Sequence, residues 1–321
     1  MAVAVLGGCG PGAPAGLVDR SNAGLEAYVT NFGSIAQPGQ TITPVNLLAA
    51  LADPSQQVGS LPSALAATPD GRTLLVTEQG ADRLALVDTA TGRPRAQIPV
   101  GLEPDAVAVS SDGRTAVVAN VGDATVTPVN LTTATAGTPI AVGKAPDAVA
   151  LAGRTALVAD FADNTVTPVD LVTMKPGAPI AVGSEPDAIV VTADGKTALV
   201  ANLGDGTVTP IDIASGTAGA PVPVGVDPTG LCIPAGPGDK TVWVSGGDSI
   251  VPIALPALTV GTAIPLGHPA EGVAVSVDGA TAWVALQDGG VVDVDISPAI
   301  VSNVIKVGGH PSAIVIPPSR T

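Results

Sequence analysis

Aromatic residues, cysteines and histidines are all scarce in this chain. Its 321 residues include two Phe, one Tyr, two Trp, two Cys and two His. Two cysteines cannot form the several disulfide bridges that hold small secreted scaffolds together. The apolar residues, 46% of the chain, are therefore mainly Val, Ala, Leu and Ile, which suit sheets that pack face to face.

Positive charge is also scarce. The chain has 13 Lys and Arg against 28 Asp and Glu, which gives a net charge of -15 and a pI near 4.2. Such a protein repels nucleic acid and anionic lipid surfaces, so we expect neither as a partner. No apolar run approaches the ~18 residues of a membrane-spanning helix, so no transmembrane span is predicted.

One short signature, a branched apolar residue followed by Gly, recurs seven times. Its glycines are 42, 42, 40, 42, 42 and 41 residues apart; the copies are Val58-Gly59, Val100-Gly101, Val142-Gly143, Val182-Gly183, Val224-Gly225, Leu266-Gly267 and Val307-Gly308. A constant period indicates a copied supersecondary unit that must stack on its neighbours to bury its apolar face.

A single period contains four short runs rich in Val, Ile and Thr. In one copy they cover residues 105–110, 115–120, 125–131 and 138–142, with an Asp-Gly turn at Asp112-Gly113 between the first two. Four strands of about six residues, with short connections, fill about 40 residues. No run shows the 3.6-residue periodicity of helical repeats. The sequence therefore predicts an all-β, seven-bladed β-propeller with four-stranded antiparallel blades.

The two chain ends share one repeat. Residues 27–58 hold strands two to four of a blade, and residues 309–317 hold a first strand with nothing after it. We expect the C-terminal strand to join the N-terminal strands and close the ring, which avoids exposed sheet edges. The predicted organisation is an N-terminal segment and flexible tether at 1–24, the propeller at 25–318 and a tail at 319–321.

Proline occupies the third strand of five blades, at Pro44, Pro128, Pro168, Pro210 and Pro252. Because proline has no amide hydrogen to donate to a ladder, a bulge or weak pairing to the outermost strand is expected there. The outer rim should be the loosest part of each blade.

The strand Tyr28-Val29-Thr30-Asn31 has shorter counterparts at Ala119-Asn120, Ala159-Asp160 and Ala201-Asn202. With the Asp-Gly turns and the Val-Gly-x-x-Pro links, it resembles the repeats of the YVTN family of β-propeller proteins, whose relatives include lactonase-like seven-bladed propellers. The resemblance covers about residues 25–318. It implies an extracytoplasmic location, secreted or attached to the cell surface, and a role in binding or attachment.

Acidic residues gather on one face of the predicted ring. Asp105, Asp147, Asp187 and Glu271 begin innermost strands and should surround the channel mouth, with a rim at Asp123, Asp163 and Asp205. Such a cluster could hold Ca²⁺ as a cofactor, could bind a small cationic ligand, or could receive an unknown protein partner. The alternative is that copied Asp residues only cap turns.

His268 and His310 lie in the same link of adjacent repeats, each preceded by Gly and followed by Pro. Together with Glu271 they offer ligand types that suit a transition metal. The alternative is a pair of solvated loop histidines. A multi-copper centre is excluded because it needs many more histidines than two.

The segment Leu6-Gly7-Gly8-Cys9 matches the lipobox of bacterial lipoproteins, and a Gly/Pro-rich stretch follows it. Lipidation of Cys9 is therefore predicted, although residues 1–6 are shorter than a signal core and lack Lys or Arg. The match requires a translation start further upstream; otherwise it arises by chance.

No motif in the chain provides an activated nucleophile. The Gly-x-Ser-x-Gly elbow is absent, and Cys232, inside an apolar run, is interpreted as a buried small residue. The sequence therefore favours a monomeric, non-catalytic binding or scaffold propeller. A propeller lactonase-type hydrolase and a metal-binding protein are the alternatives.

Overall fold

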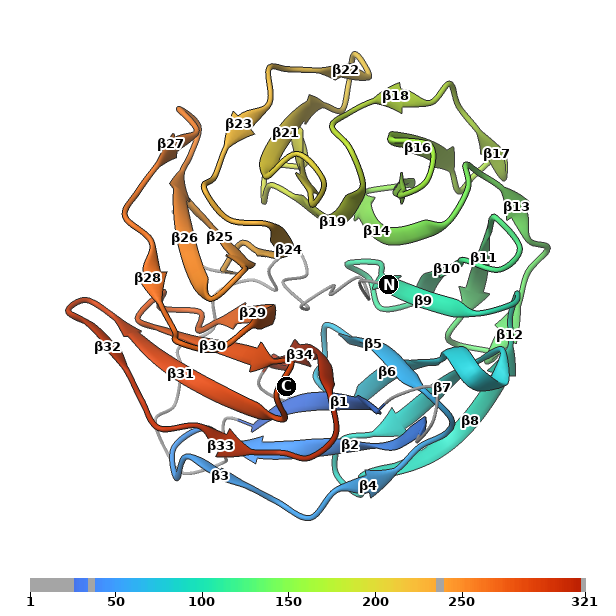
Figure 1. The fold of residues 1–321 in the computed structure, drawn as a ribbon. Coiled ribbons are helices and arrows are strands. Elements are labelled where there is room, and N and C mark those ends of the chain that lie inside the picture. The colour runs from blue at the N-terminus through green and yellow to red at the C-terminus, as the bar shows by residue number, and fades with distance from the viewer. Residues whose placement is uncertain (1–25, 34–37, 235–239, 319–321) are drawn as a thin grey trace.

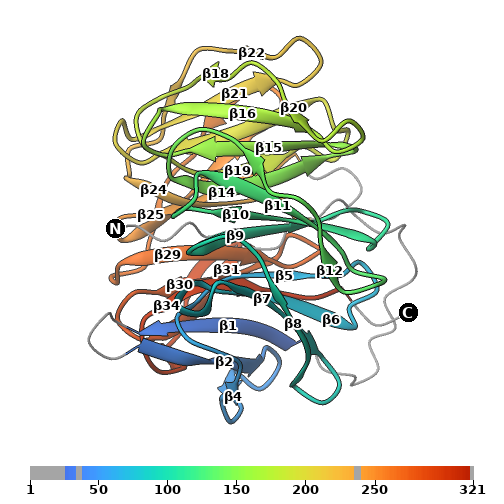
Figure 2. The same ribbon diagram turned by 90° about the vertical axis from the view of Figure 1, so that its right-hand side faces the viewer.

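A computed structural model describes residues 26–33, 38–234 and 240–318. Seven antiparallel sheets stand around one axis, and their innermost strands are β5, β9, β14, β19, β24, β29 and β34 (Figure 1). Each innermost strand contacts the innermost strands on both sides. Figure 2 shows the same sheets from the side of the ring. The predicted seven-bladed propeller is confirmed.

Six blades are formed by consecutive strands. The first contains β5 (Pro62–Ala67), β6 (Thr73–Glu78), the 3-10 helix η1 (Gln79–Ala81), β7 (Arg83–Asp88) and β8 (Arg93–Pro99). The second contains β9 (Pro104–Val109), β10 (Thr115–Asn120), β11 (Thr125–Asn130), β12 (Thr135–Ala136) and β13 (Ile140–Ala141). The third contains β14 (Pro146–Ala152), β15 (Thr155–Asp160), β16 (Thr165–Asp170), β17 (Lys175–Pro176) and β18 (Ile180–Ala181).

The next three blades repeat this order. They contain β19 (Pro186–Val191), β20 (Thr197–Asn202), β21 (Thr207–Asp212), β22 (Thr217–Ala218) and β23 (Val222–Pro223); β24 (Pro228–Cys232), β25 (Thr241–Gly246), β26 (Ser249–Ala254), β27 (Thr259–Val260) and β28 (Ile264–Pro265); and β29 (Ala270–Val275), β30 (Thr281–Leu286), β31 (Gly290–Ile296), β32 (Ala299–Val301) and β33 (Ile305–Lys306).

The seventh blade joins the two ends of the chain. Strand β34 (Pro311–Val315) pairs with β1 (Glu26–Gly33), and β1 pairs with β2 (Pro38–Asn46), whose outer edge carries β3 (Leu51–Ala52) and β4 (Gln56–Gln57). Tyr28 lies opposite Val315, and Val29 opposite Ile314. The predicted closure of the ring by the C-terminal strand is confirmed.

Small branched side chains build the core between blades. The second strands are almost completely buried; Ala116–Ala119 in β10 and Ala198–Ala201 in β20 have no exposed area. One apolar cluster joins Val117 of β10, Val149 of β14 and Ile189 of β19, so it crosses three blades. Burial of apolar area between sheets, worth about 25 cal/mol per Å², is therefore what holds neighbouring blades together.

The outer edge of most blades is divided. In the described residues, six sheets carry two short outer segments, whereas β8 runs unbroken from Arg93 to Pro99. At the break, a proline carbonyl accepts a hydrogen bond from a glycine amide, as from Gly137 to Pro128 at 2.7 Å. The predicted weak pairing to the outermost strand at Pro44, Pro128, Pro168, Pro210 and Pro252 is confirmed, and Asp293 occupies the same place in the sixth divided blade.

The glycine that begins each link is needed for two different reasons. At Gly101 and Gly183 a Cβ would lie 2.6 Å from the amide carbon of Asn120 or Asn202, so the close approach excludes a side chain. Gly225 and Gly267 instead have φ near +76° and +74°, a conformation that L residues rarely adopt. The same Gly of the repeat signature therefore occurs in two different backbone conformations.

Within residues 26–33, 38–234 and 240–318, no helix has the length and apolar character needed to cross a membrane.

Candidate functional site: the axial ring

The second residue of each innermost strand occupies an equivalent place around the axis. We call these seven residues the axial ring: Ser63, Asp105, Asp147, Asp187, Thr229, Glu271 and Ser312. None of them is more than 7% exposed. The four acids predicted at the channel mouth are therefore brought into one ring, together with three hydroxyl residues that the sequence analysis missed.

A β-bulge presents each ring residue to the axis. In β14, Pro146 pairs with Asp160 and Ala148 pairs with Ala159, which leaves Asp147 outside the ladder. The pairing of the innermost strand with its neighbour shifts at this place in all seven blades. Bulges bend a strand and redirect a side chain, so the repeat supplies seven redirected positions whose chemistry can vary.

The hydroxyl members of the ring are satisfied by hydrogen bonds. Ser312 Oγ donates to the Ser63 carbonyl at 2.8 Å, and Ser63 Oγ donates to Asp105 Oδ1. Across the ring, Thr229 Oγ1 donates to the Glu271 carbonyl at 2.9 Å. These residues tie neighbouring innermost strands together, which is a structural role.

Asp147 and Asp187 form the most strained electrostatic part of the ring. Burial, followed by the charges of Asp105 and Asp187, raises the pKa of Asp147 well above its ordinary value. Burial likewise raises the pKa of Asp187 to about 8. A hydrogen bond with Asp147 opposes this rise, and the negative charges of Glu271 and Asp105 add to it. The two carboxyl groups therefore retain protons near neutral pH unless a cation joins them.

Three oxygen atoms of this pair have no hydrogen-bond partner among the described residues: Asp147 Oδ2 and both carboxyl oxygens of Asp187. Asp187 has no exposed area, so water at the surface does not solvate it. Buried carboxyl oxygens are nearly always partnered, because an unpartnered one costs about 1–3 kcal/mol or more. Apart from the protons that the carboxyl groups share with one another, no donor among the described residues serves these oxygens.

Glu271 lies on a different blade and has one firm partner. Gln287 Nε2 donates to Glu271 Oε2 at 2.6 Å. Burial raises the pKa of Glu271 to about 7, and the bond from Gln287 opposes the rise. Because its charge also raises the pKa of Asp187, Glu271 adds to the negative potential around the unpartnered oxygens.

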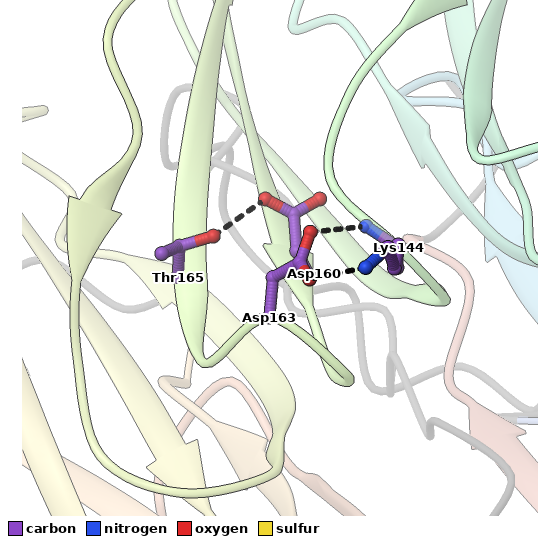
Figure 3. Close-up of polar contacts among 4 residues, drawn as sticks. All are labelled: Lys144, Asp160, Asp163 and Thr165. Atoms are coloured by element: carbon purple, nitrogen blue, oxygen red, sulfur yellow. Dashed lines mark hydrogen bonds and ion pairs between the residues drawn. The ribbon is translucent and has the colours of Figure 1, made fainter.

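The predicted rim acids accept hydrogen bonds from backbone amides of the links. Each accepts a hydrogen bond from the residue after a link glycine: Asp123 from Leu102 N at 2.8 Å, Asp163 from Lys144 N at 2.9 Å and Asp205 from Ser184 N at 2.6 Å. Asp163 also forms an ion pair with Lys144 Nζ at 3.7 Å (Figure 3). The capping alternative describes this rim.

Asp160 is a buried acid that the sequence analysis did not select as a site. It accepts hydrogen bonds from Thr165 Oγ1 at 3.1 Å (Figure 3) and from Thr167 Oγ1 at 2.6 Å. Burial raises its pKa to about 6, against those hydrogen bonds and one from the Gly143 amide. The equivalent Asn120 instead donates to the matching threonine hydroxyls at 3.0 and 2.9 Å. The sequence did contain a signal for this buried acid, because Asp160 stands where the neighbouring repeats have Asn120 and Asn202.

The two histidines have separate partners. His268 Nδ1 lies 2.7 Å from Asp288 Oδ2, and His310 Nδ1 lies 2.7 Å from the Gln287 carbonyl oxygen. Across the residues that the structure describes, no three His, Cys, Asp or Glu side chains form a group that could hold a metal ion. The Cys9 lipidation site lies outside the described residues, whereas Cys232 is fully buried in β24.

Comparison with known proteins identifies the fold alone. No family model and no curated protein matches the chain. Among solved structures, a functionally unknown protein from Desulfotomaculum acetoxidans is similar with a TM-score of 0.80 at 15% identity, over 92% of this chain and 99% of that one. Hydrazine synthase from Kuenenia stuttgartiensis is similar with a TM-score of 0.72 at 20% identity, over 81% and 90%.

Proposed function

We propose that this protein is a non-catalytic binding propeller whose axial ring takes a cationic group. One observation carries the proposal: Asp147 and Asp187 are buried side by side, and three of their four carboxyl oxygens lack a partner among the described residues. A bound cation would neutralise their charge and satisfy their oxygens, so the complex would gain what the free protein lacks.

The net charge of the chain also favours a cationic ligand. At -15, the protein attracts cations over its whole surface, and the ring acids provide the deepest negative site that we find in the described residues. The rim acids Asp123, Asp163 and Asp205, which cap backbone amides, add to the negative electrostatic potential but do not contact the cation.

Thermal unfolding in the presence of cations tests the proposal. Calcium chloride, potassium chloride and alkylammonium chlorides are compared at constant ionic strength, for the parent and for D105N/D147N/D187N. A bound cation raises Tm in proportion to RT ln(1 + [L]/Kd). E103Q is the matched control, because Glu103 is an exposed acid beside the ring strand β9. If no cation shifts Tm of the parent more than that of the triple variant, the ring is not a cation site.

The YVTN resemblance and the extracytoplasmic location belong to the same proposal. What supports the resemblance is that Thr30 and Asn31 of the intact motif hold the closing blade: Thr30 Oγ1 lies 2.7 Å from Ser312 Oγ, and Asn31 Nδ2 donates to Thr43 Oγ1 at 2.8 Å. The location follows only from the resemblance. Fractionation of the native organism, with mass spectrometry of the mature N-terminus, tests the location. Lactone hydrolysis is a separate hypothesis, which a lactone screen of purified protein tests.

A further inference from the structure

We infer that the group bound by the axial ring is a primary ammonium, the head group of an organic amine, held between Asp147 and Asp187. The inference rests on the proposed cation-binding function and names the class of ligand.

The number of donors and acceptors favours this ligand. For Asp147 Oδ2 and the two carboxyl oxygens of Asp187, the donors in the free protein are the protons that the neighbouring carboxyl groups share, and no other group of the described residues donates to them. A primary ammonium presents three N–H donors and no acceptor. Hydrogen bonds between an ammonium and a carboxylate are also among the short, strong ones, at about 2.7–2.9 Å. One head group can therefore satisfy the whole orphan set.

Other cations match the site less well. Calcium takes about six to eight oxygens at 2.3–2.6 Å, yet Asp105 Oδ1 already accepts from Ser63 and Gln79, and Glu271 Oε2 accepts from Gln287. No three acids converge as a metal-ligand group in the described ranges. A guanidinium brings five donors to three acceptors, and a quaternary ammonium brings no N–H donor at all.

The burial of the ring limits what enters it. Asp147 is 6% exposed and Asp187 is 0% exposed, so a ligand reaches Asp187 only if the ring opens, and a compact head group needs a smaller opening than a large polar ligand. The alkyl part of the amine would then extend along the axis. Selectivity should depend on the N–H groups and only weakly on the length of the chain that follows.

Binding should release protons. In the free protein, burial raises the pKa of the Asp147 and Asp187 carboxyl groups so that they retain protons, and the charges of Asp105, Glu271 and Glu185 add to this rise. On the other side of β19, strand β24 contributes only the hydroxyl of Thr229, and Asp160 at the end of β15 is the remaining buried acid nearby. An ammonium replaces those protons, so its affinity should rise between pH 6 and pH 8.

Isothermal titration calorimetry at pH 8 tests the inference with the full chain. The probes are n-butylammonium, tetramethylammonium, guanidinium and calcium chlorides at constant ionic strength, each in two buffers of different ionisation enthalpy. We expect n-butylammonium to bind with proton release, which appears as a buffer-dependent heat. D187N should weaken that binding at least 10-fold, and E103Q should leave it within 2-fold. Circular dichroism confirms that both variants are folded.

The outcomes separate this inference from the proposed function. If calcium or tetramethylammonium binds as tightly as n-butylammonium, and D187N abolishes that binding, the ring is a cation site but the ammonium assignment is overturned. If n-butylammonium binds equally to the parent and D187N, the assignment is also overturned. If no cation binds any form, the proposed function fails with it.

Discussion

The innermost and outermost strands of the same blades satisfy their polar groups in opposite ways. At the rim, the carbonyl of Pro128 or Pro210, where the ladder breaks, accepts a hydrogen bond from a glycine amide at 2.7 Å. Asp293, which has an amide hydrogen, donates it to Ser302 Oγ at 3.2 Å. At the axis, Asp187 is fully buried with both carboxyl oxygens unpartnered among the described residues.

This contrast indicates where the fold tolerates irregular structure. The rim lies near solvent, so a broken ladder costs little and short local hydrogen bonds repair it. The axis is buried, so an unsatisfied carboxyl group there lowers the stability of the free protein. Stability alone does not account for Asp147 and Asp187, because Ser63, Thr229 and Ser312 occupy equivalent positions with their hydroxyls hydrogen-bonded.

Removal of the closing inner strand should have the largest effect. A chain that ends at Gly308 lacks β34, in which Ala313, Ile314 and Val315 are fully buried. It should lose the cooperative thermal transition and aggregate, because β1 then exposes an edge. A chain that ends at Pro318 keeps β34 and serves as the control. Matching melts for both chains would show that the closure does not stabilise the ring.

Neutralising the buried pair should stabilise the free protein at alkaline pH. The raised pKa values mean that folding takes up protons, so the stability contributed by Asp147 and Asp187 declines as pH rises from about 4 to about 8. D147N/D187N does not titrate there. We expect its Tm to exceed that of the parent by about 5–10 °C at pH 8 and to converge with it at pH 4. A Tm difference that does not vary with pH would contradict the assignment of these protons.

Asp160, midway between axis and rim, should show a smaller version of the same effect. Its pKa of about 6 against an ordinary 3.8 means a stability loss of about 3 kcal/mol once pH exceeds 6. Asn120 and Asn202 show that an amide fits this place. D160N should therefore recover about 3 kcal/mol at pH 7.5 in urea unfolding, and N202D should lose a similar amount. Equal stability of both variants and the parent would contradict the prediction that the buried carboxylate of Asp160 destabilises the fold.

Substitutions at the rim should have the smallest effect. P168A restores an amide hydrogen beside an outer edge that is already divided, so we expect a change of less than about 1 kcal/mol in urea unfolding. Leu86 holds the equivalent place in the blade with the unbroken β8 and is buried. L86P should cost about 3 kcal/mol, because proline disturbs a residue that is paired on both sides, with Leu75 and Ala96, and the core contact is lost. If P168A destabilises as much as L86P, the rim is not the tolerant region.

The architecture could be predicted from the sequence because the pattern that specifies it is periodic. The constant spacing of the link glycines predicted seven blades, and the matching residues at 27–58 and 309–317 predicted the shared one. Proline in the third strand predicted the weak pairing at the outer edge, but not its division into two short segments. Asp293 was missed, because its ladder is broken by a side-chain hydrogen bond from Ser302 that no local propensity reveals.

The site was predicted only in part. Position in the repeat placed Asp105, Asp147, Asp187 and Glu271 together, because equivalent residues in stacked blades meet at the axis. The hydroxyl residues Ser63 and Ser312 were missed because nothing in their type signals chemistry. Which oxygens lack partners depends on side-chain geometry, and the capping by Asp123 depends on a backbone amide 21 residues away.

The closing blade also determines how the molecule bears mechanical load. Strands β1 and β34 are antiparallel, and Tyr28 near the start of one lies opposite Val315 near the end of the other. A force applied between the two chain ends is therefore perpendicular to the strands and breaks their hydrogen bonds one after another, from Val315 towards Pro311. If the protein is held at one end and pulled at the other, this junction yields first, and the six blades of continuous chain are loaded only after it has opened.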